Sequence, residues 1–181
     1  MGIEIEKKYR VTTEQAAAVV KALREDGAIF IGDENEENVI YGGPPLDPVG
    51  AVVRIRKTPN GSLLTYKRRI DSEHAVKHQI EYESAIADPD EVASILTSLE
   101  LEPRLIYEKR RQTWQYGEVE VVVDKLPFGD YIEIEGAIFA IAEVEMRLGM
   151  EGFEAEHETY PRLTATFGKI TGGIIESRFD Q

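Results

Sequence analysis

The chain has 181 residues and a mass of 20.4 kDa, which suits one domain whose core needs neither disulfides nor a structural metal. Its 34 Asp and Glu against 21 Lys and Arg give a net charge of −13, so a general surface field opposes binding to nucleic acid or an anionic membrane. Cysteine is absent, which excludes thiol nucleophiles and Cys-ligated zinc and fits a reducing cytoplasm. No segment has the roughly 20 apolar residues of a membrane span, so we expect a cytoplasmic protein with no membrane and no nucleic-acid partner.

The first predicted elements are a strand and a helix. Residues 2–10 alternate apolar and charged side chains, which is the period-two pattern of a strand with two unlike faces. Thr12 and Gln15 have the spacing of a capping box, an alanine-rich run follows, and Gly27 stands where a C-cap is expected. Together these signals predict a helix over 13–26.

The next stretch predicts short strands and one tight hairpin. Residues 28–31 and 38–41 favour two short strands, followed by a loop rich in Gly and Pro, a candidate lid. Two alternating strands, 51–57 and 62–70, are joined across Asn60-Gly61, a dipeptide that supplies the positive φ angles of a hairpin turn.

The remaining chain predicts more antiparallel strands with helices between them. Turn signals and alternation place the strands, while an Asp-Pro start and helical periodicity place the helices. The predicted strands are 77–86, 104–114, 118–125 and 130–136, and the predicted helices are 88–98, 138–149 and 158–169.

Most of the predicted strands have one charged face and one apolar face. An open antiparallel sheet with a solvated face would explain that alternation alone. Full charges of both signs dominate the polar positions, however, and a curled sheet would gather them in one lumen. The charges are Glu4, Glu6, Lys8, Arg54, Arg56, Lys67, Glu81, Glu83, Lys109, Arg111, Asp124, Glu133 and Glu135.

Such a lumen would combine two kinds of site. Its carboxylates, Glu4, Glu6, Glu81, Asp124, Glu133 and Glu135, would repel one another unless cations neutralised them, and they suit hard ions such as Mg²⁺ or Mn²⁺. Its basic residues, Lys8, Arg54, Arg56, Lys67, Lys109 and Arg111, offer point charges and bidentate forks for phosphates. Metal ligands and phosphate ligands together indicate a polyphosphate site.

The ordered set of motifs resembles the CYTH proteins, or triphosphate tunnel metalloenzymes. The E-x-E-x-K signature is Glu4, Glu6 and Lys8; the R-x-R strand is Arg54 and Arg56; the T-Y-K strand is Thr65-Tyr66-Lys67. The later motifs are Glu81-Tyr82-Glu83, Lys109-Arg110-Arg111 and the ending Asp124, Gly129, Glu133 and Glu135. Each motif alone is weak, whereas the six in order are specific. One departure is Gln79, where the family often has a basic residue.

The resemblance implies an α+β fold, namely a closed antiparallel eight-stranded β-barrel with helices packed on the outside. It covers roughly residues 2–168, from which we expect a tunnel domain over 1–170 and a C-terminal tail over 171–181. It implies Mg²⁺ or Mn²⁺ on Glu4, Glu6, Asp124, Glu133 and Glu135, and catalytic roles for Glu4, Glu6 and Lys8. Substrate binding is implied for Lys8, Arg54, Arg56, Lys67, Glu81, Lys109 and Arg111.

The resemblance favours a metal-dependent triphosphatase acting on tripolyphosphate or on a nucleoside or thiamine triphosphate. A class IV adenylate cyclase, which converts ATP to cyclic AMP and pyrophosphate in the same kind of tunnel, is the alternative. A noncatalytic polyphosphate or nucleotide sensor is a lesser alternative, against which the retained carboxylates argue. Either a monomer or a homodimer is compatible with these features.

Overall fold

The structure is a computed structural model that describes residues 5–70 and 78–180, so Glu4 and the start of the first predicted strand lie outside the described residues. The chain divides into two compact units. Unit 1 consists of Met1–Ile3, Asn35–Glu108 and Thr159–Gln181; unit 2 consists of Glu4–Glu34 and Lys109–Glu158. Strands β2 (Ile29–Gly42) and β6 (Glu102–Tyr116) each pass from one unit into the other.

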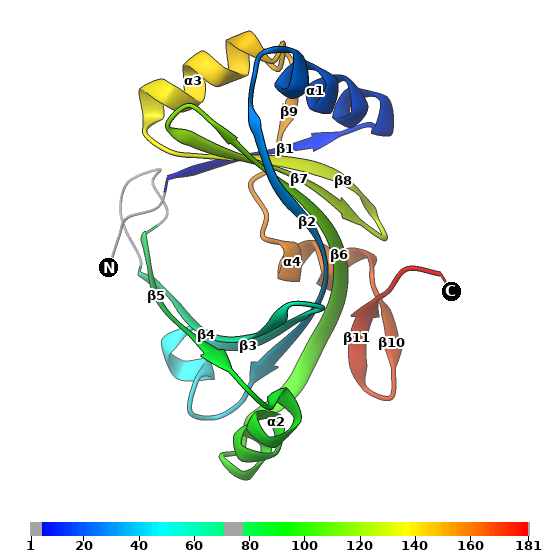
Figure 1. Cartoon of the computed structure of the whole chain (residues 1–181). Helices are drawn as coiled ribbons and strands as arrows, with labels where there is room; N and C mark the ends of the chain where they lie inside the picture. The colour runs from blue at the N-terminus through cyan, green and yellow to red at the C-terminus, as the bar shows by residue number, and fades with distance from the viewer. Residues whose placement is uncertain (1–4, 71–77, 181) are drawn as a thin grey trace. The chain divides into compact units, whose positions relative to one another are not determined.

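Unit 1 is built on an antiparallel meander. In the order of the sheet, β5 pairs with β4, β4 with β3 and β3 with β2, and β2 is followed by β6 (Figure 1). The three new strands are β3 (Ala51–Thr58), β4 (Gly61–Ile70) and β5 (His78–Ile86). The hairpin predicted at Asn60-Gly61 is confirmed, since Thr58 pairs with Gly61 across that turn.

One face of this meander packs into an apolar core. Val39, Val53 and Ile55 alternate with charged residues along β2 and β3 and meet Leu96 of α2 (Pro89–Ser98). Asp88 caps α2, because its carboxylate accepts hydrogen bonds from two backbone N–H groups of the first turn. The apolar face therefore lies under α2, and the charged residues lie on the other face of the strands.

The C-terminal segment adds a helix and a hairpin to unit 1. These are α4 (Tyr160–Phe167), β10 (Lys169–Thr171) and β11 (Ile174–Ser177); a short 3-10 helix, η1 (Asp47–Val49), lies in the earlier Gly- and Pro-rich loop. Strand β11 pairs in parallel with β6, with Ser177 opposite Tyr107. This pairing is possible because β7 pairs with β6 only over Arg110–Tyr116, leaving the earlier part of β6 available on that side.

Unit 2 contains the strand order β6-β7-β8-β1-β9 and two helices. Its elements are β1 (Glu6–Val11), α1 (Thr13–Glu25), β7 (Val119–Leu126), β8 (Gly129–Glu135), α3 (Ile138–Arg147) and β9 (Glu154–Ala155). Figure 1 shows α1 and α3 on the same side of these strands, where Val19, Leu23 and Val144 join the core formed by Val121 and Ile132. The predicted capping box of α1 is present, since Thr12 and Gln15 bond each other's backbone N–H at 3.2 and 2.8 Å.

The structure confirms the α+β class and the large antiparallel sheet, and it corrects two details. The segments predicted as separate strands at 28–31 and 38–41 belong to one continuous strand, β2. The residues between them contain no proline, and their side chains alternate between more exposed and less exposed positions, as in a strand. The described residues form an eleven-stranded sheet rather than eight strands, since β9, β10 and β11 are additional. Among these residues no hydrogen-bonded ladder joins β5 to β9, the two ends of the strand order, so hydrogen bonds do not close the predicted barrel.

Candidate functional site

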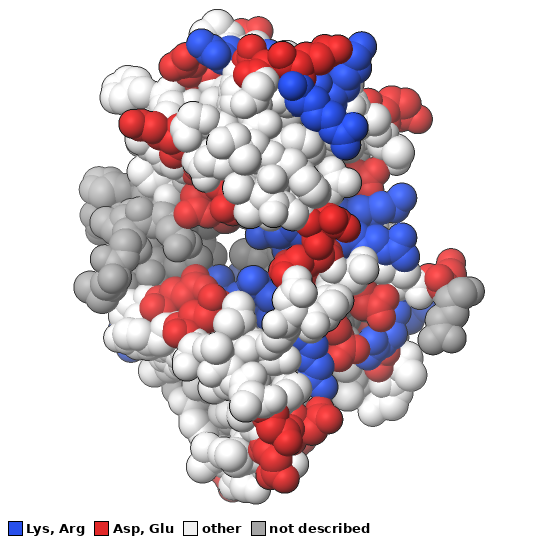
Figure 2. All heavy atoms as spheres, in the orientation of Figure 1, with Lys and Arg blue, Asp and Glu red and all other residues white. Residues whose placement is uncertain are grey.

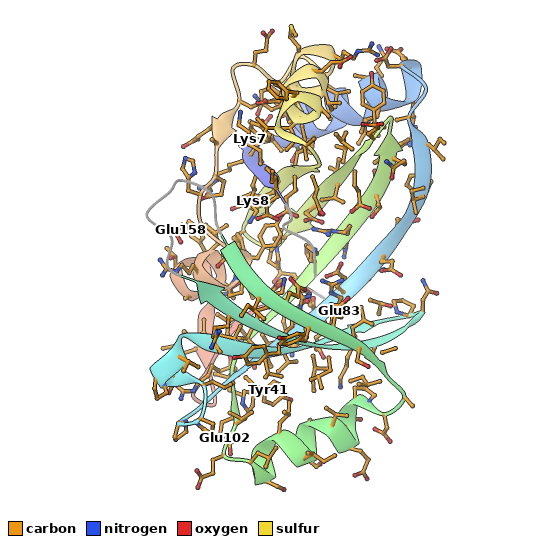
Figure 3. All side chains as sticks on the ribbon, turned by 90° about the vertical axis from the view of Figure 1, so that its left-hand side faces the viewer. Lys7, Lys8, Tyr41, Glu83, Glu102 and Glu158 are labelled. Carbon is orange, nitrogen blue, oxygen red and sulfur yellow. The ribbon has the colours of Figure 1, made fainter. Side chains whose placement is uncertain are left out.

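In unit 2, the charged face begins with Lys8 on β1. Lys8 lies directly opposite Glu133 of β8, and its ammonium group is 3.2 Å from a Glu133 carboxylate oxygen. It also donates a hydrogen bond of 3.1 Å to the backbone carbonyl of Glu158, a residue labelled with Lys8 in Figure 3. The Lys8 side chain is only 7% exposed, so its charge depends on these partners rather than on water.

Arg111 of β6 connects two predicted metal ligands. Its guanidinium donates two hydrogen bonds to Asp124, at 2.8 and 2.6 Å, and a third of 2.7 Å to Glu133. Lys109, two residues earlier on the same face, places its ammonium group 3.5 Å from Asp124. Asp124 is fully buried and Lys109 is 4% exposed, which makes this a desolvated cluster whose charges balance one another.

A second group of carboxylates lies next to this cluster on the same strands. Glu135 of β8 is opposite Glu6 of β1 on one side and opposite Glu120 of β7 on the other. Like charges placed directly opposite each other destabilise a sheet, and a bound cation relieves that cost. Within residues 5–70 and 78–180, however, no three carboxylate or histidine side chains converge as metal ligands.

In unit 1, the predicted basic residues are also matched by carboxylates. The Lys67 ammonium is 2.8 Å from Glu81, its direct neighbour across β4 and β5. Glu83, labelled in Figure 3, accepts a 2.7 Å hydrogen bond from the Thr65 hydroxyl. Arg54 donates to both of these groups, at 3.3 Å to Thr65 and 3.5 Å to Glu83.

Glu36 and Asn38 of β2 belong to the same charged face and were missed by the sequence analysis. The buried Glu36 carboxylate is 3.6 Å from the Arg56 guanidinium and accepts a 3.1 Å hydrogen bond from the Asn38 amide. Asn38 lies directly opposite Arg56. Glu36 lies in the polar run 32–37, which has no apolar alternation to indicate a strand, and Asn38 lies in the predicted strand 38–41 but carries no charge.

Tyr107 of β6 is a third residue that sequence reasoning did not select. It is 3% exposed, and burial raises the pKa of its phenol, while the charges of Arg54 and Arg56 act to lower it. The signal was alternation, because Tyr107 shares a strand face with Lys109 and Arg111.

Two arginines of unit 1 hold buried donors that the described residues do not satisfy. The Nε atoms of Arg54 and Arg56 and the Oδ1 atom of Asn38 are buried without a hydrogen-bond partner among these residues, although the Arg56 Nε atom lies 3.6 Å from the Glu36 carboxylate as an ion pair. A buried polar group without a partner costs about 1–3 kcal/mol, so such groups are rare outside functional sites. A phosphate oxygen would offer the Arg54 Nε atom the acceptor that it lacks among the described residues, and would compete with Glu36 for the Arg56 Nε atom.

The predicted site residues thus fall into two clusters, which we name the unit 1 cluster and the unit 2 cluster. The unit 1 cluster contains the predicted Arg54, Arg56, Lys67 and Glu81, joined by Glu36, Asn38, Thr65, Glu83 and Tyr107. The unit 2 cluster contains Glu6, Lys8, Lys109, Arg111, Asp124, Glu133 and Glu135, joined by Glu120. Both clusters mix full charges of both signs on one face of a sheet.

Acidic and basic side chains are also interspersed on the outer surface, as the face in Figure 2 shows. Arg178, for example, contacts three carboxylates, those of Glu37, Glu108 and Glu176, at 2.7 to 3.1 Å. No helix in the described part of the chain is long and apolar enough to cross a membrane.

Comparisons with known proteins agree with this arrangement of strands. A family model described as the CYTH domain matches residues 2–158. The PH1012 protein of Pyrococcus horikoshii OT3 has a similar structure, with a TM-score of 0.75, 26% identity and coverage of 88% of this chain and 98% of that one. A comparison with curated proteins found no match.

Two further solved structures share the fold at lower identity. HpAC1 from Hippeastrum, described as a candidate adenylyl cyclase with a dominant triphosphatase activity, has a TM-score of 0.72, 17% identity and coverage of 97% of this chain and 100% of that one. A protein of Vibrio parahaemolyticus described as a candidate adenylate cyclase has a TM-score of 0.68, 21% identity and coverage of 90% of this chain and 98% of that one.

Proposed function

Because the chain belongs to the CYTH domain family, we propose that it is a metal-dependent triphosphatase. Its substrate would be inorganic tripolyphosphate or a related organic triphosphate such as a nucleoside or thiamine triphosphate. The observation that carries the proposal is the set of buried or half-buried cations that share sheet faces with carboxylates in both clusters. Burying ionised groups is costly, and an apolar face would be more stable, so retention of these charges favours a binding role.

In the proposed site, the basic residues hold the phosphates. Arg54, Arg56 and Lys67 would bind from the unit 1 cluster, where the buried Nε donor of Arg54 has no hydrogen-bond acceptor among the described residues. Lys8, Lys109 and Arg111 would bind from the unit 2 cluster. Their carboxylate partners, including Glu81 beside Lys67, orient them before the substrate arrives and limit the repulsion among the cations.

We propose that the carboxylates Glu4, Glu6, Asp124, Glu133 and Glu135 hold Mg²⁺ or Mn²⁺. The donor type fits hard cations, and the placement of Glu6 opposite Glu135 gives a cation a role in relieving repulsion. When bound, the ion would supply Lewis-acid polarisation of a phosphoryl oxygen. Asp124 and Glu133 also bond Arg111, so they would position phosphate-binding cations as well.

The catalytic assignments follow from position in the unit 2 cluster. Lys8 is held between Glu133 and the Glu158 carbonyl, an arrangement that fixes its ammonium as a point charge for a phosphate oxygen. Glu6 precedes it on the same strand face, and Glu4 and Glu6 would serve the metal and the attacking water. Hydrolysis in this site would yield orthophosphate and a shortened phosphate chain.

An adenylate cyclase is the second candidate, because two similar structures carry cyclase in their descriptions. Both reactions would use the same phosphate-binding and metal-binding walls. They differ in the nucleophile, which is water in one case and the 3′-hydroxyl of ATP in the other. We favour hydrolysis because the charged residues of the two clusters are of the kind that would bind phosphates.

The deciding experiment is a product analysis. Purified protein is incubated with Mg²⁺ or Mn²⁺ and, separately, tripolyphosphate, ATP and thiamine triphosphate, and the products are separated by ion-exchange chromatography. Orthophosphate release supports the triphosphatase, whereas cyclic AMP with pyrophosphate from ATP would establish the cyclase instead. Binding without turnover of any of the three would identify a noncatalytic polyphosphate or nucleotide sensor. Activity that survives EDTA would rule out the metal.

We also propose the surroundings in which this activity operates. The protein would act in the cytoplasm as a monomer or homodimer, with neither nucleic acid nor a membrane as a partner. Residues 1–170 would form the tunnel domain and residues 171–181 the tail, although β11 of that tail pairs with β6.

A further inference from the structure

We propose that Glu156 is a positioning residue that holds the Lys8 ammonium in the orientation that binds a phosphate. This inference rests on the proposed function and deepens it by adding a residue outside the recognised motifs. Glu156 follows β9 in unit 2, and its carboxylate bonds the backbone of Glu158, the residue whose carbonyl Lys8 contacts. Glu156 therefore acts on Lys8 through the backbone that lies between them.

A closed set of hydrogen bonds joins Lys8 to the segment 156–158. The Lys8 ammonium donates a 3.1 Å hydrogen bond to the backbone carbonyl of Glu158, and both residues are labelled in Figure 3. The backbone N–H of Glu158 donates in turn to the Glu156 carboxylate at 2.8 Å. The backbone N–H of Glu156 donates to the backbone carbonyl of Lys8, also at 2.8 Å. The side chain and the backbone of one lysine are thus tied to the same short segment.

The segment that carries this carbonyl belongs to neither a strand nor a helix. Strand β9 ends at Ala155 and α4 begins at Tyr160, so residues 156–159 lie between regular elements. In such a segment, a side chain can pair with a backbone N–H that a ladder or a helix would otherwise pair. The Glu156 carboxylate does this for the N–H of Glu158. The position of the Glu158 carbonyl consequently depends on the Glu156 side chain.

A backbone carbonyl suits this role because it is an acceptor without a net charge. Lysine carries a point charge on a flexible stem, so the groups around it decide where that charge lies. Lys8 is 7% exposed, and Glu133 already holds its ammonium at 3.2 Å. Another carboxylate at the ammonium would offset more of its charge and weaken its attraction for phosphate. The Glu158 carbonyl fixes the ammonium and leaves that attraction in place.

The first test measures the reactivity of Lys8 and needs no substrate. Wild type and Glu156→Ala are treated with acetic anhydride, and acetylation of Lys7 and Lys8 is followed separately by mass spectrometry. Lys8 should react about 10-fold faster in the variant, because its ammonium loses a charge-assisted hydrogen bond. Lys7 is 47% exposed and points to the opposite face of β1, so its rate should not change. An unchanged rate at Lys8, or an equal rise at Lys7, would overturn the inference.

Glu154→Ala is the matched control for this measurement. Glu154 is an exposed glutamate on β9, two residues before Glu156, and its pairing with Arg10 is made by the backbone. The substitution should leave the acetylation rates of both lysines at their wild-type values. A rise at Lys8 as large as that in Glu156→Ala would show that any change in this segment exposes the lysine, which contradicts a specific role of Glu156.

The second test separates the hydrogen bond of Glu156 from its charge. Glu156→Gln keeps a side-chain oxygen that accepts the Glu158 N–H but removes the negative charge. For Mg²⁺-dependent hydrolysis of tripolyphosphate, Glu156→Ala should lower kcat/KM about 10-fold, and Glu156→Gln should restore it. Glu154→Ala should leave kcat/KM unchanged. If Glu156→Gln is as impaired as Glu156→Ala, the charge matters rather than the bond, and the positioning role is refuted.

The acetylation measurement distinguishes failure of this inference from failure of the proposed function. If the wild type neither binds nor hydrolyses tripolyphosphate, the proposed function fails, and faster acetylation of Lys8 in Glu156→Ala still supports its orientation by Glu156. An acetylation rate that does not change contradicts that orientation whatever the activity.

Discussion

Replacing Asp124 with Asn should destabilise the protein, because it removes a buried negative charge that pairs with Lys109 and Arg111 in the unit 2 cluster. Asp124 is fully buried, accepts two hydrogen bonds from Arg111 at 2.8 and 2.6 Å, and lies 3.5 Å from the Lys109 ammonium. Asparagine keeps the shape but removes the negative charge and one strong acceptor. Glu133 still accepts a 2.7 Å hydrogen bond from Arg111, which reduces the loss of stability.

The expected cost is about 3 kcal/mol, at the lower end of the range for breaking a buried ion pair. For a chain of this length, that cost corresponds to a fall in Tm of about 6 to 12 °C. Thermal unfolding followed by circular dichroism measures it. Asp26→Asn is the matched control, because Asp26 is 47% exposed and its ion pair with Arg147 at 3.5 Å is a surface contact. The control should change stability by less than about 0.5 kcal/mol.

Added tripolyphosphate provides a further check on the reasoning. If Arg111 and Lys109 bind phosphates, the ligand supplies the negative charge that Asp124→Asn removed, and Tm of the variant should rise on addition of tripolyphosphate. A variant as stable as the wild type would refute the assignment of Asp124 as the counter-charge of this cluster. If the variant is destabilised but its Tm does not change on addition of tripolyphosphate, Asp124 balances the buried charge and the cluster does not bind the ligand.

Three other predictions concern the metal, the substrate and pH. Glu135→Gln should lower Mg²⁺- or Mn²⁺-dependent hydrolysis by about two orders of magnitude with little loss of stability, whereas Glu118→Gln, an exposed turn residue, should not; equal rates would exclude Glu135 from the metal site. Arg56→Ala should weaken tripolyphosphate binding, measured by calorimetry, by about 2–5 kcal/mol, and unchanged affinity would place Arg56 outside the site. Because the pKa of Tyr107 is raised above 10.0 in the folded chain, the unfolded chain loses the proton first, so its contribution to the free energy of unfolding is complete below pH 10.0 and declines above it. Urea titrations of Tyr107→Phe should accordingly show a shallower alkaline decline than the wild type, and parallel declines would contradict the raised pKa.

The buried charge pairs show how the two clusters combine stability with binding. Each cation of the unit 2 cluster has a carboxylate within hydrogen-bonding or ion-pairing distance, so the unliganded fold avoids isolated buried charge. The balance also means that a single substitution affects both stability and affinity. Measurements of turnover therefore need stability controls of the kind described for Asp124.

Much of the secondary structure could be predicted from the sequence, because each strand has a regular pattern within its own residues. Alternation located β1, β3, β4, β7 and β8, Asn60-Gly61 located a hairpin, and Thr12 with Gln15 located the start of α1. Alternation also assigned each charged residue to one face of its strand, since successive side chains point to opposite sides. That rule needs no knowledge of neighbouring strands, which is why the charged face was predictable from sequence.

The partners of those charges depended on register, which alternation alone does not specify. The sequence could not say that Arg111 bonds both Asp124 and Glu133, or that Glu135 lies between Glu6 and Glu120, because these residues are far apart along the chain. The parallel pairing of β11 with β6 and the continuity of β2 likewise arise from long-range packing. The sequence by itself determined which residues share a charged face, through the geometry of the strand; only the tertiary structure decided which of them meet, because strand pairing sets the distances between them.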